Sequence, residues 1–325
     1  MTLQSQVFEA FDRLLPPHTK TLVVGVSGGA DSMALTLLAR DYAIVKDYDL
    51  QTATVDHQLR QDSAAEALWV EQALLDLNIS HQTLIWHHQE ELKRRHEQAR
   101  KARYQLLLDF CKDYPSPVLL TAHHQQDQAE TILMRFLKGS GPDGFQGIRA
   151  IHHQHAAPIV RPLLGITPQD LRIYLQANSL TWIEDPSNQD SFYERTRVRK
   201  LLSHLGDLGW QQDGILASAA KIYELQQNFA AIIGEYAKGF TITDTPLTID
   251  QAKFYAAPQP VQRDWLRQQI WQIGEADYPK PYLTIEAILR MLKQPKVNDY
   301  FVAGCLIKVA NQIIVLSKTQ NPREL

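Results

Sequence analysis

Hydrophobic positions in the first part of the chain alternate between short continuous runs and helical spacing. The short runs, typical of buried strands, lie at residues 21–26, 50–55, 80–86 and 118–122. Helical patterns separate them, at about 33–46, 62–77, 89–112 and 126–138. Strands that alternate with helices at this spacing build βαβ units, whose parallel sheet is covered by helices on both faces. The pattern therefore predicts an α/β fold with a Rossmann-like, doubly wound parallel sheet.

The rest of the chain predicts further elements and a second domain. An amphipathic helix opens the chain and ends at Pro16, while residues 139–147 form a glycine-rich loop without regular structure. A strand at 158–164 and a helix with Thr167 as its cap and Pro168 at its first position follow. Beyond them we expect a long helix at 215–237, helices near 248–273 and 284–293, and a hairpin of residues 300–309 and 312–317. These patterns predict a domain of residues 1–212, a helical connector of residues 213–239 and a smaller α+β domain of residues 240–325.

The composition of the 325 residues fits a soluble globular protein of two or three domains, with 44% hydrophobic and 21% charged residues. A formal net charge of −3 excludes a polycation that coats nucleic acid, so an RNA partner would need local basic patches. The two cysteines, Cys111 and Cys305, form no CxxC pair, which argues against a disulfide scaffold or a zinc ribbon. Because the sequence has no signal-peptide core and no run of about 18 apolar residues, we expect a cytoplasmic protein that does not bind membranes.

The first strand-like run leads into a glycine turn and then a helix: Ser27, Gly28, Gly29, Ala30, Asp31 and Ser32. In such a turn successive backbone N–H groups point into one concavity at the positive end of the helix dipole, which suits a phosphate. The turn has neither the lysine of a kinase-type P-loop nor the spacing of a dinucleotide fingerprint. A carboxylate beside phosphates suits Mg²⁺. The pattern resembles the PP-loop of the ATP pyrophosphatases, which cleave ATP to AMP and pyrophosphate.

Ligands of doubly wound sheets collect at the carboxyl ends of the strands. The order of elements therefore brings residues 27–32, Asp56 with His57, and residues 123–127 to one edge of the sheet. In the helix after the fourth strand, His123, Asp127 and Glu130 share one face, opposite an apolar face that we expect to pack on the sheet. The polar face is either solvated or a site that binds an ammonium group, assists a metal or accepts a proton from an attacking amine.

Two basic clusters have two interpretations each. One helix carries Lys93, Arg94, Arg95, Arg100, Lys101 and Arg103, and a later segment after Tyr193 carries Arg195, Arg197, Arg199 and Lys200. Both clusters could be solvated helix surface. Alternatively they contact RNA backbone or polyphosphate, because guanidinium groups match phosphate oxygens and interleaved aromatic rings stack on unpaired bases.

Seven motifs together resemble the bacterial tRNA(Ile)-lysidine synthases. They are the glycine turn, VDHQLR from Val55, EQARKARY from Glu97, AHHQQDQAET from Ala122, GSGPDGFQGI from Gly139, RPLL from Arg161, and EDPSNQD with the following RTRVR. They cover residues 23 to about 202 in the family's order. This chain has Gln126 where the family often has a first acid, so only Asp127 can take that role. It has Gln58 where a small residue is usual.

The resemblance implies that the chain joins free L-lysine to C2 of the wobble cytidine of a tRNA(Ile) with a CAU anticodon, through an adenylated cytidine. It implies that Ser27, Gly28, Gly29, Ala30 and Ser32 bind the pyrophosphate part of ATP and that Asp31 holds Mg²⁺. Asp56 and His57 would lie near the nucleotide. Asp127 and Glu130 would bind lysine and activate its amine, assisted by His123 or His124. Phosphate contacts would come from Arg100, Arg103 and Arg199, and tRNA contacts from Arg195, Arg199 and residues 240–325.

Other functions fit parts of the sequence. A PP-loop tRNA thiolase shares the adenylation step but needs a catalytic cysteine or an iron–sulfur cluster, and an amidotransferase-coupled synthetase such as GMP synthetase needs a glutaminase. A non-catalytic RNA-binding module could keep the same fold. A homodimer stays open, because the sequence does not reveal the oligomeric state.

Overall fold

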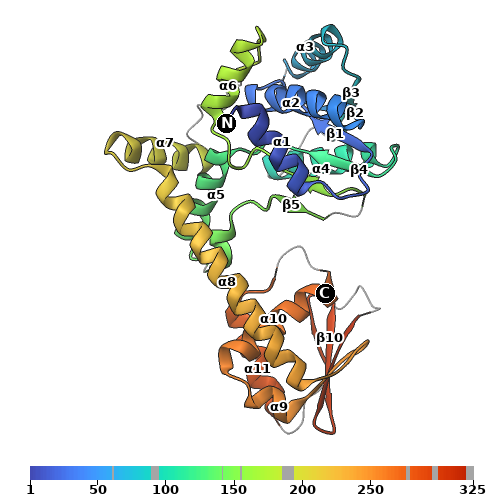
Figure 1. Cartoon of the computed structure of the whole chain (residues 1–325). Coiled ribbons are helices and arrows are strands. Elements are labelled where there is room, and N and C mark those ends of the chain that lie inside the picture. Colours follow the sequence, from blue (N-terminus) through green and yellow to red (C-terminus); the bar gives the residue numbers. More distant parts are fainter. Residues whose placement is uncertain are drawn as a thin grey trace. The chain divides into compact units, whose positions relative to one another are not determined.

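The computed structural model describes residues 1–60, 62–88, 95–140, 142–153, 156–184, 194–275, 279–294 and 299–319. The chain forms two compact units, Met1–Ile222 and Tyr223–Leu325. The division lies inside one long helix, α8 (Gln212–Phe240), which was expected at 215–237 (Figure 1). The domain limits expected from the sequence, at residues 212 and 239, stay a prediction.

The first unit contains a six-stranded sheet in the order β3-β2-β1-β4-β6-β5. All neighbours are parallel except β5 and β6, so the predicted doubly wound sheet is confirmed and has one antiparallel edge strand. The strands are β1 (Thr21–Gly25), β2 (Asp49–Asp56), β3 (His81–Ile85), β4 (Pro117–Leu120), β5 (Ile151–His152) and β6 (Ile159–Val160).

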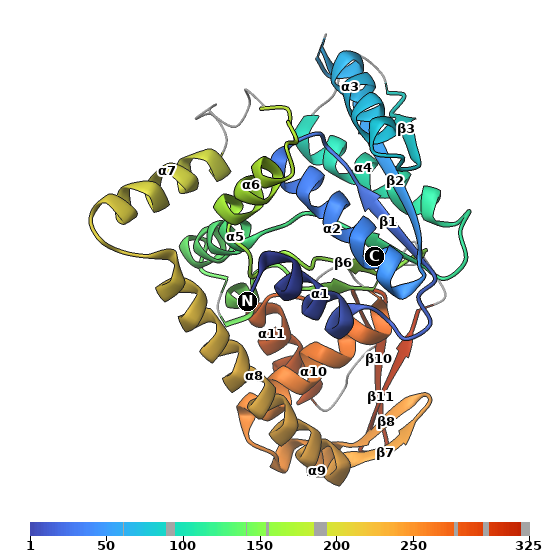
Figure 2. The same ribbon diagram turned by 45° about the horizontal axis from the view of Figure 1, so that its top comes forward.

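Helices cover both faces of this sheet because alternate residues of a strand point to opposite sides (Figure 2). Leu22 and Val24 of β1 join a core with α1, α2, α3 and α6, whereas Val23 between them joins a second core with α4. The helices of this unit are α1 (Leu3–Leu14), α2 (Ala30–Lys46), α3 (Ser63–Asp76), α4 (Arg95–Cys111), α5 (Gln125–Leu137), α6 (Pro168–Ala177) and α7 (Glu194–Asp207). As predicted, the side chain of Thr167 caps α6, whose first residue is Pro168.

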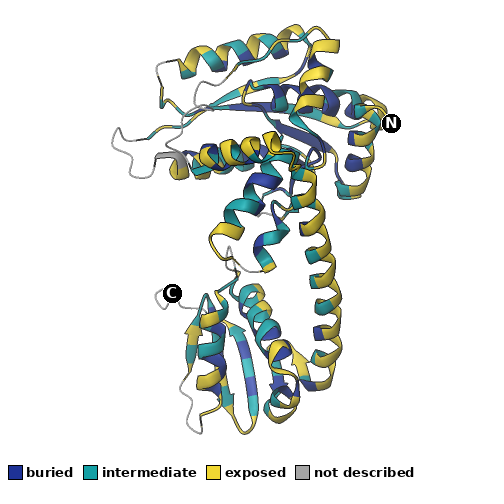
Figure 3. Cartoon of the chain, turned by 90° about the vertical axis from the view of Figure 1, so that its left-hand side faces the viewer, coloured by how far each residue is buried: buried dark blue, intermediate teal, exposed yellow. Residues whose placement is uncertain are grey.

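The second unit contains an antiparallel sheet in the order β7-β8-β11-β10-β9, with helices against it. Buried residues gather where β10 and β11 meet α10 (Figure 3). Its elements are β7 (Thr241–Asp244), β8 (Leu247–Asp250), α9 (Gln251–Ala256), α10 (Gln259–Gly274), α11 (Tyr282–Leu292), β9 (Tyr300–Val302), β10 (Cys305–Ala310) and β11 (Ile313–Lys318). No helix among the described residues is long and apolar enough to span a membrane.

Two expectations for the second unit were wrong. The single helix expected at 248–273 is a strand and two helices, because Asp250 caps a new helix and Pro258 starts another. The strand expected at 300–309 is interrupted by a turn at Ala303 and Gly304, whose φ values are 49° and 78°. The sheet therefore has a three-stranded meander where a hairpin was expected.

Two expectations for the first unit also need correction. The glycine-rich loop contains a 3₁₀ helix, η1 (Pro142–Gln146). The apolar face of α5 packs on α7 rather than on the sheet: Ala129 lies in one cluster with Val198 and Leu202, while Phe136 is 58% exposed. The helix α7 was not predicted from the sequence, and its apolar residues Val198 and Leu202 cover the apolar face of α5.

Candidate active site

The three strand-end clusters meet at the carboxyl edge of the sheet, as the order of elements predicts. Strands β2, β1 and β4 are neighbours, so residues 27–32 lie between Asp56 on one side and the loop after β4 on the other. A direct contact joins two of the clusters: Nε2 of His124 lies 3.4 Å from Oδ2 of Asp31. The glycine turn and the start of α5 therefore belong to one site.

The glycine turn has the tight geometry that a phosphate cradle needs. Gly28 has φ +81°, and a Cβ atom there would lie 2.8 Å from side-chain atoms of Ile183 and Val70. Its carbonyl oxygen accepts a hydrogen bond of 2.9 Å from the Ile183 amide. Inside the turn, the Ser32 hydroxyl donates to Gly29 O and accepts from the Ser27 amide at 3.1 Å. These contacts fix the turn and leave only glycine acceptable at position 28.

The turn ends as the N-terminus of α2. Gly29 is the N-cap residue and provides no side-chain hydrogen bond to the first turn of the helix, which contains Ala30, Asp31 and Ser32. These first amides are the groups that an oxyanion satisfies at a helix N-terminus. The Asp31 side chain is 35% exposed beside them. The turn thus combines free amide donors with an accessible carboxylate.

His124 links this turn to the helix α5. It is the N-cap of α5, and a capping box joins it to Asp127: the Asp127 amide donates to Nδ1, and Oδ2 of Asp127 accepts from the His124 amide at 3.0 Å. Burial alone would lower the pKa of His124, but the hydrogen bond to Asp31 and the charges of Asp127 and Glu130 outweigh it and raise that pKa. The imidazole thus lies between carboxylates, with Nδ1 accepting from the Asp127 amide and Nε2 facing Asp31.

Glu130 does not lie on a solvated face, contrary to one interpretation of the sequence. Its side chain is fully buried, and its two oxygens accept hydrogen bonds of 2.8 Å from Nε of Arg195 and 2.7 Å from Nε of Arg199. Arg195 also lies 3.4 Å from Oδ1 of Asp127 and donates to the Thr131 hydroxyl at 3.3 Å. The two arginines expected to contact tRNA thus bring α7 to the carboxylates of α5.

His123 has the opposite surroundings to His124. Burial, followed by the charges of Arg161, Arg100, Arg103 and Arg195, lowers the pKa of His123 to about 2. Its Nδ1 lies 3.0 Å from the Thr121 hydroxyl. Neighbouring histidines therefore divide the site into an acidic side at the glycine turn and a basic side at α4.

The cluster at the end of β2 lies next to this basic side. Asp56 is buried and accepts a hydrogen bond of 2.9 Å from the Gln58 amide, and Gln58 itself has φ +50°. Burial and, next, the charge of Arg103 lower the pKa of His57 to about 4. The His57 ring lies 5.9 Å from the ring of Trp86. A neutral imidazole and a tryptophan thus stand beside the expected nucleotide position.

Parts of the two basic clusters can be placed and parts cannot. Several of the expected residues lie outside the described residues: Lys93, Arg94, the side chain of Arg95, residues 185–190 and Tyr193. Lys101 forms a surface ion pair with Glu97 at 3.2 Å, which fits a solvated helix face. The sequence interpretation did not single out Tyr104, Arg161 and Ile183, which contact the site from three different parts of the chain. Tyr104 and Arg161 belong to the EQARKARY and RPLL motifs, and Ile183 directly precedes EDPSNQD. Nothing in the spacing of these residues indicates which side chains point into the site.

Comparison with known proteins gives the family. The PP-loop domain model matches residues 2–205. A tRNA(Ile)-lysidine synthase of Orientia tsutsugamushi is 39% identical over 91% of this chain and 69% of its own length. A tRNA(Ile)-lysidine synthase of Ruegeria pomeroyi is 34% identical over 90% of this chain and 69% of its own length. The chain belongs to the tRNA(Ile)-lysidine synthase family. Its glycine turn is therefore the PP-loop of an ATP-binding domain.

Among solved structures, the U34-tRNA thiolase NcsA from Methanococcus maripaludis, described with its [4Fe-4S] cluster, is similar with a TM-score of 0.56. At 15% identity over 68% of this chain and 78% of that chain, the likeness shows the fold alone. Both cysteines of this tRNA(Ile)-lysidine synthase family member are buried, and burial raises their pKa values, to about 12 for Cys111 and about 11 for Cys305. Neither is a reactive thiolate, which disfavours the thiolase alternative.

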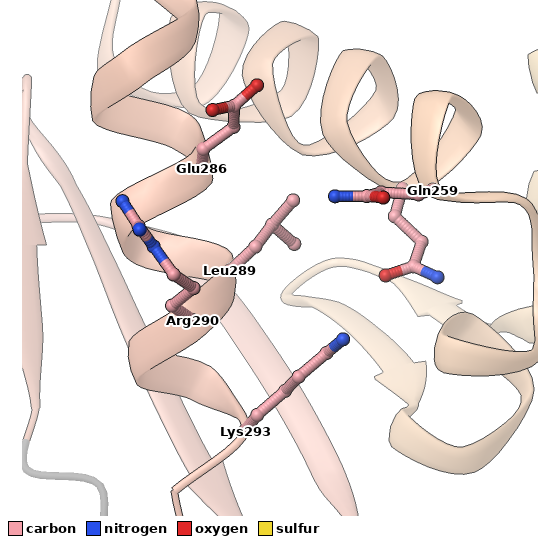
Figure 4. A pocket seen from close by; sticks show the side chains of 6 residues that line it. Gln259, Glu286, Leu289, Arg290 and Lys293 are labelled. Atoms are coloured by element: carbon pink, nitrogen blue, oxygen red, sulfur yellow. The ribbon is translucent and has the colours of Figure 1, made fainter.

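The hollows of the described residues include one in each unit. One of about 260 Å³ lies beside the active site and is lined by Thr131, Met134, Arg135, Lys138 and Arg195. The other, of about 180 Å³, belongs to the second unit and is lined by Leu289, Arg290 and Lys293 together with Gln259 of α10, toward which Lys293 extends (Figure 4). None of the site residues expected from the sequence lines the second hollow.

Proposed function

We propose that this chain joins free L-lysine to C2 of the wobble cytidine of a CAU-anticodon isoleucine tRNA while ATP is split to AMP and pyrophosphate. The observation that carries the proposal is the contact between Asp31 in the PP-loop and His124 at the start of α5. It brings a phosphate cradle and the carboxylate of Asp127 into one site, as a reaction between a nucleotide and an amine requires. Membership of the tRNA(Ile)-lysidine synthase family supports the choice of substrates.

The PP-loop would bind the pyrophosphate part of ATP. The amides at the start of α2 donate to phosphate oxygens, and the Ser27 and Ser32 hydroxyls, 3.1 Å apart, lie in the same turn. Asp31 fits a Mg²⁺ ligand, because its carboxylate is accessible beside the cradle and Mg²⁺ takes one or two carboxylates together with phosphate oxygens and water. When bound, the ion would neutralise charge on the polyphosphate. The C2 oxygen of the cytidine attacks the α-phosphorus, forms the adenylate and releases pyrophosphate.

Asp127 is the carboxylate that we assign to the lysine amine. Its side chain is partly accessible, whereas both oxygens of Glu130 are used by Arg195 and Arg199. The ε-ammonium group must lose a proton before it attacks C2 and displaces AMP, and a neighbouring carboxylate can accept that proton. Glu130 then acts by positioning the two arginines. This division refines the expectation that Asp127 and Glu130 have the same role.

The second unit would bind the body of the tRNA. In support, Arg263 and Arg267 of α10 lie 4.6 and 4.4 Å from the ring centre of Tyr282, a combination of aromatic and basic side chains that can contact RNA, although Asp264 and Glu286 pair with Arg263. Recognition of the isoleucine tRNA would then come from contacts outside the anticodon. A homodimer stays a prediction.

The test is a reaction with radiolabelled lysine, ATP and an isoleucine tRNA transcript that bears CAU. We expect label in the RNA, together with AMP and pyrophosphate in equal amounts. A methionine tRNA with the same anticodon is the control and should stay unlabelled. Release of ADP and inorganic phosphate, or AMP formation that does not depend on lysine and tRNA, would contradict the proposal.

A further inference from the structure

The basic side of the active site holds more positive charge than the protein balances. Arg161, which follows β6, is only 7% exposed, and Arg100 and Arg103 of α4 lie close enough to act on the same groups. Among the described residues, no carboxylate oxygen lies within 4.0 Å of a side-chain nitrogen of these three arginines. A buried guanidinium without a counter-charge is unfavourable. The arrangement is therefore suited to an anion that comes from outside the chain.

Tyr104 is the centre of this group. The guanidinium carbons of Arg100 and Arg103 lie 5.2 and 5.4 Å from the centre of its ring. Its hydroxyl oxygen is buried and makes no hydrogen bond of good geometry within the described chain, and the same holds for Nε of Arg161, although the two side chains are close enough to interact. Nη1 of Arg161 donates a hydrogen bond of 2.8 Å to the Arg149 carbonyl. An N–H and an O–H thus stand unused in the same basic pocket.

A phosphate oxygen is the acceptor that these donors fit. Arginine and tyrosine donate strong hydrogen bonds to phosphate, and an anion would also relieve the repulsion among the arginines. The position agrees with this, because β6 lies beside β4 and Arg161 therefore stands at the same sheet edge as His123. The three arginines also lower the pKa of Tyr104, although burial opposes them, which makes its hydroxyl a better donor.

We propose that Tyr104 and Arg161 complete a phosphate subsite on the α4 side of the active site, in addition to the phosphate contacts already expected of Arg100 and Arg103. The inference rests on the proposed function for the source of the phosphate, which is either the α-phosphate of ATP or a phosphodiester of the tRNA next to the target cytidine. Either ligand offers the same oxygens. Arg100 is the exposed member of the group.

Tyr104→Phe tests this subsite cleanly. It removes one hydroxyl. If that hydroxyl only stabilised the fold, the variant would melt at a lower temperature and bind its ligands as wild type does. The subsite predicts an equal or higher melting temperature and weaker binding, by about fivefold or more for one charge-assisted hydrogen bond. Tyr114→Phe, three residues after the end of α4, is the matched control and should change neither quantity.

Two binding measurements identify the source. Weaker ATP binding without tRNA would assign the subsite to the α-phosphate, and weaker tRNA binding without ATP would assign it to the RNA backbone. Arg161→Lys keeps the charge but removes the Nε donor, and it should weaken the same ligand. Unchanged binding of both ligands by Tyr104→Phe would overturn the proposal, and so would a lower melting temperature. These measurements are independent of lysine transfer by the wild-type chain, so the subsite and the proposed function can fail separately.

Discussion

Oδ2 of Asp31 lies 3.4 Å from Nε2 of His124, so one side-chain contact connects the PP-loop to the helix that carries Asp127. Any change to this pair alters both halves of the site, because His124 is also the N-cap of α5. If Asp31 acts on bound phosphates as proposed, its side chain has two roles, one at the phosphate cradle and one in the contact with the imidazole.

Asp31→Asn should reduce ATP-dependent pyrophosphate release at least about 100-fold, because the neutral amide cannot carry the charge expected to act on the phosphates. The fold should persist, since the side chain is partly exposed and the α2 backbone is unchanged. Pyrophosphate release and thermal melting measure the two effects. Asp47→Asn makes the same chemical change at the other end of α2, where asparagine tolerates the φ of 57°. Equal activity of the two variants would contradict the role of Asp31.

Arg199→Ala should lower the free energy of unfolding by about 1–3 kcal/mol, because fully buried Glu130 loses one of its two cationic donors. Arg13→Ala on the exposed face of α1 should change it by less than about 0.5 kcal/mol. Adding Glu130→Gln to Arg199→Ala should restore part of the loss, because an amide needs no counter-charge. Urea titrations of wild type, the two single variants and the double variant give the coupling energy between Glu130 and Arg199. A coupling energy near zero would show that this buried pair does not stabilise the packing of α7 on α5.

The contrast between Asp31 and Glu130 shows what the sequence can predict. The PP-loop is local: two glycines between a strand and a helix are enough to indicate a phosphate cradle, and strand order places Asp56 and His123 near it. The environment of Glu130 depends on α7, far along the chain, and helical spacing alone cannot tell a solvated face from one that another helix covers. The spacing of Arg195 and Arg199, one helical turn apart, was the available signal that these side chains act together.

The basic side of the site shows the same limit. Arg161 stands in the RPLL motif directly after β6, and a strand of two residues gives little hydrophobic pattern to show where it ends. Tyr104 lies on a helix whose charged residues suggest a solvated face, yet its hydroxyl is buried. Burial of a polar group is a tertiary property, so only the structure could show that these donors lack partners.

Gly28→Ala should destabilise the protein by about 1–3 kcal/mol, because alanine at φ +81° is strained and its methyl group would meet Ile183 and Val70. Gly29→Ala is the matched variant: Gly29 has φ −72°, and its added methyl group would have only Ser27 Oγ nearby, at 3.7 Å. We expect Gly29→Ala to melt near the wild-type temperature. Thermal melts of both variants are the measurement, and equal destabilisation would contradict the strained turn described here.

The pH dependence of stability should contain a contribution from His81, outside the active site. Burial lowers the pKa of His81 from 6.5 to about 4, and its Nδ1 lies 2.8 Å from the Thr52 hydroxyl. Between pH 6.5 and 4 the unfolded chain binds a proton at this residue and the folded chain does not. The free energy of unfolding should therefore fall as the pH drops through this window, by up to about 1.4 kcal/mol per pH unit for this one group.

His81→Asn should remove that contribution, because the amide does not titrate. Carboxylates also titrate as the pH falls, but they do so in both proteins, so the difference between variant and wild type isolates the histidine. We expect urea unfolding to show a smaller stability loss from pH 7 to pH 5 for His81→Asn than for wild type. His18→Asn, at an exposed position, should leave the loss unchanged. Equal losses in His81→Asn and wild type over this interval would contradict the prediction. They would mean that the imidazole is protonated in the folded chain as readily as in the unfolded chain, despite the burial that lowers its pKa.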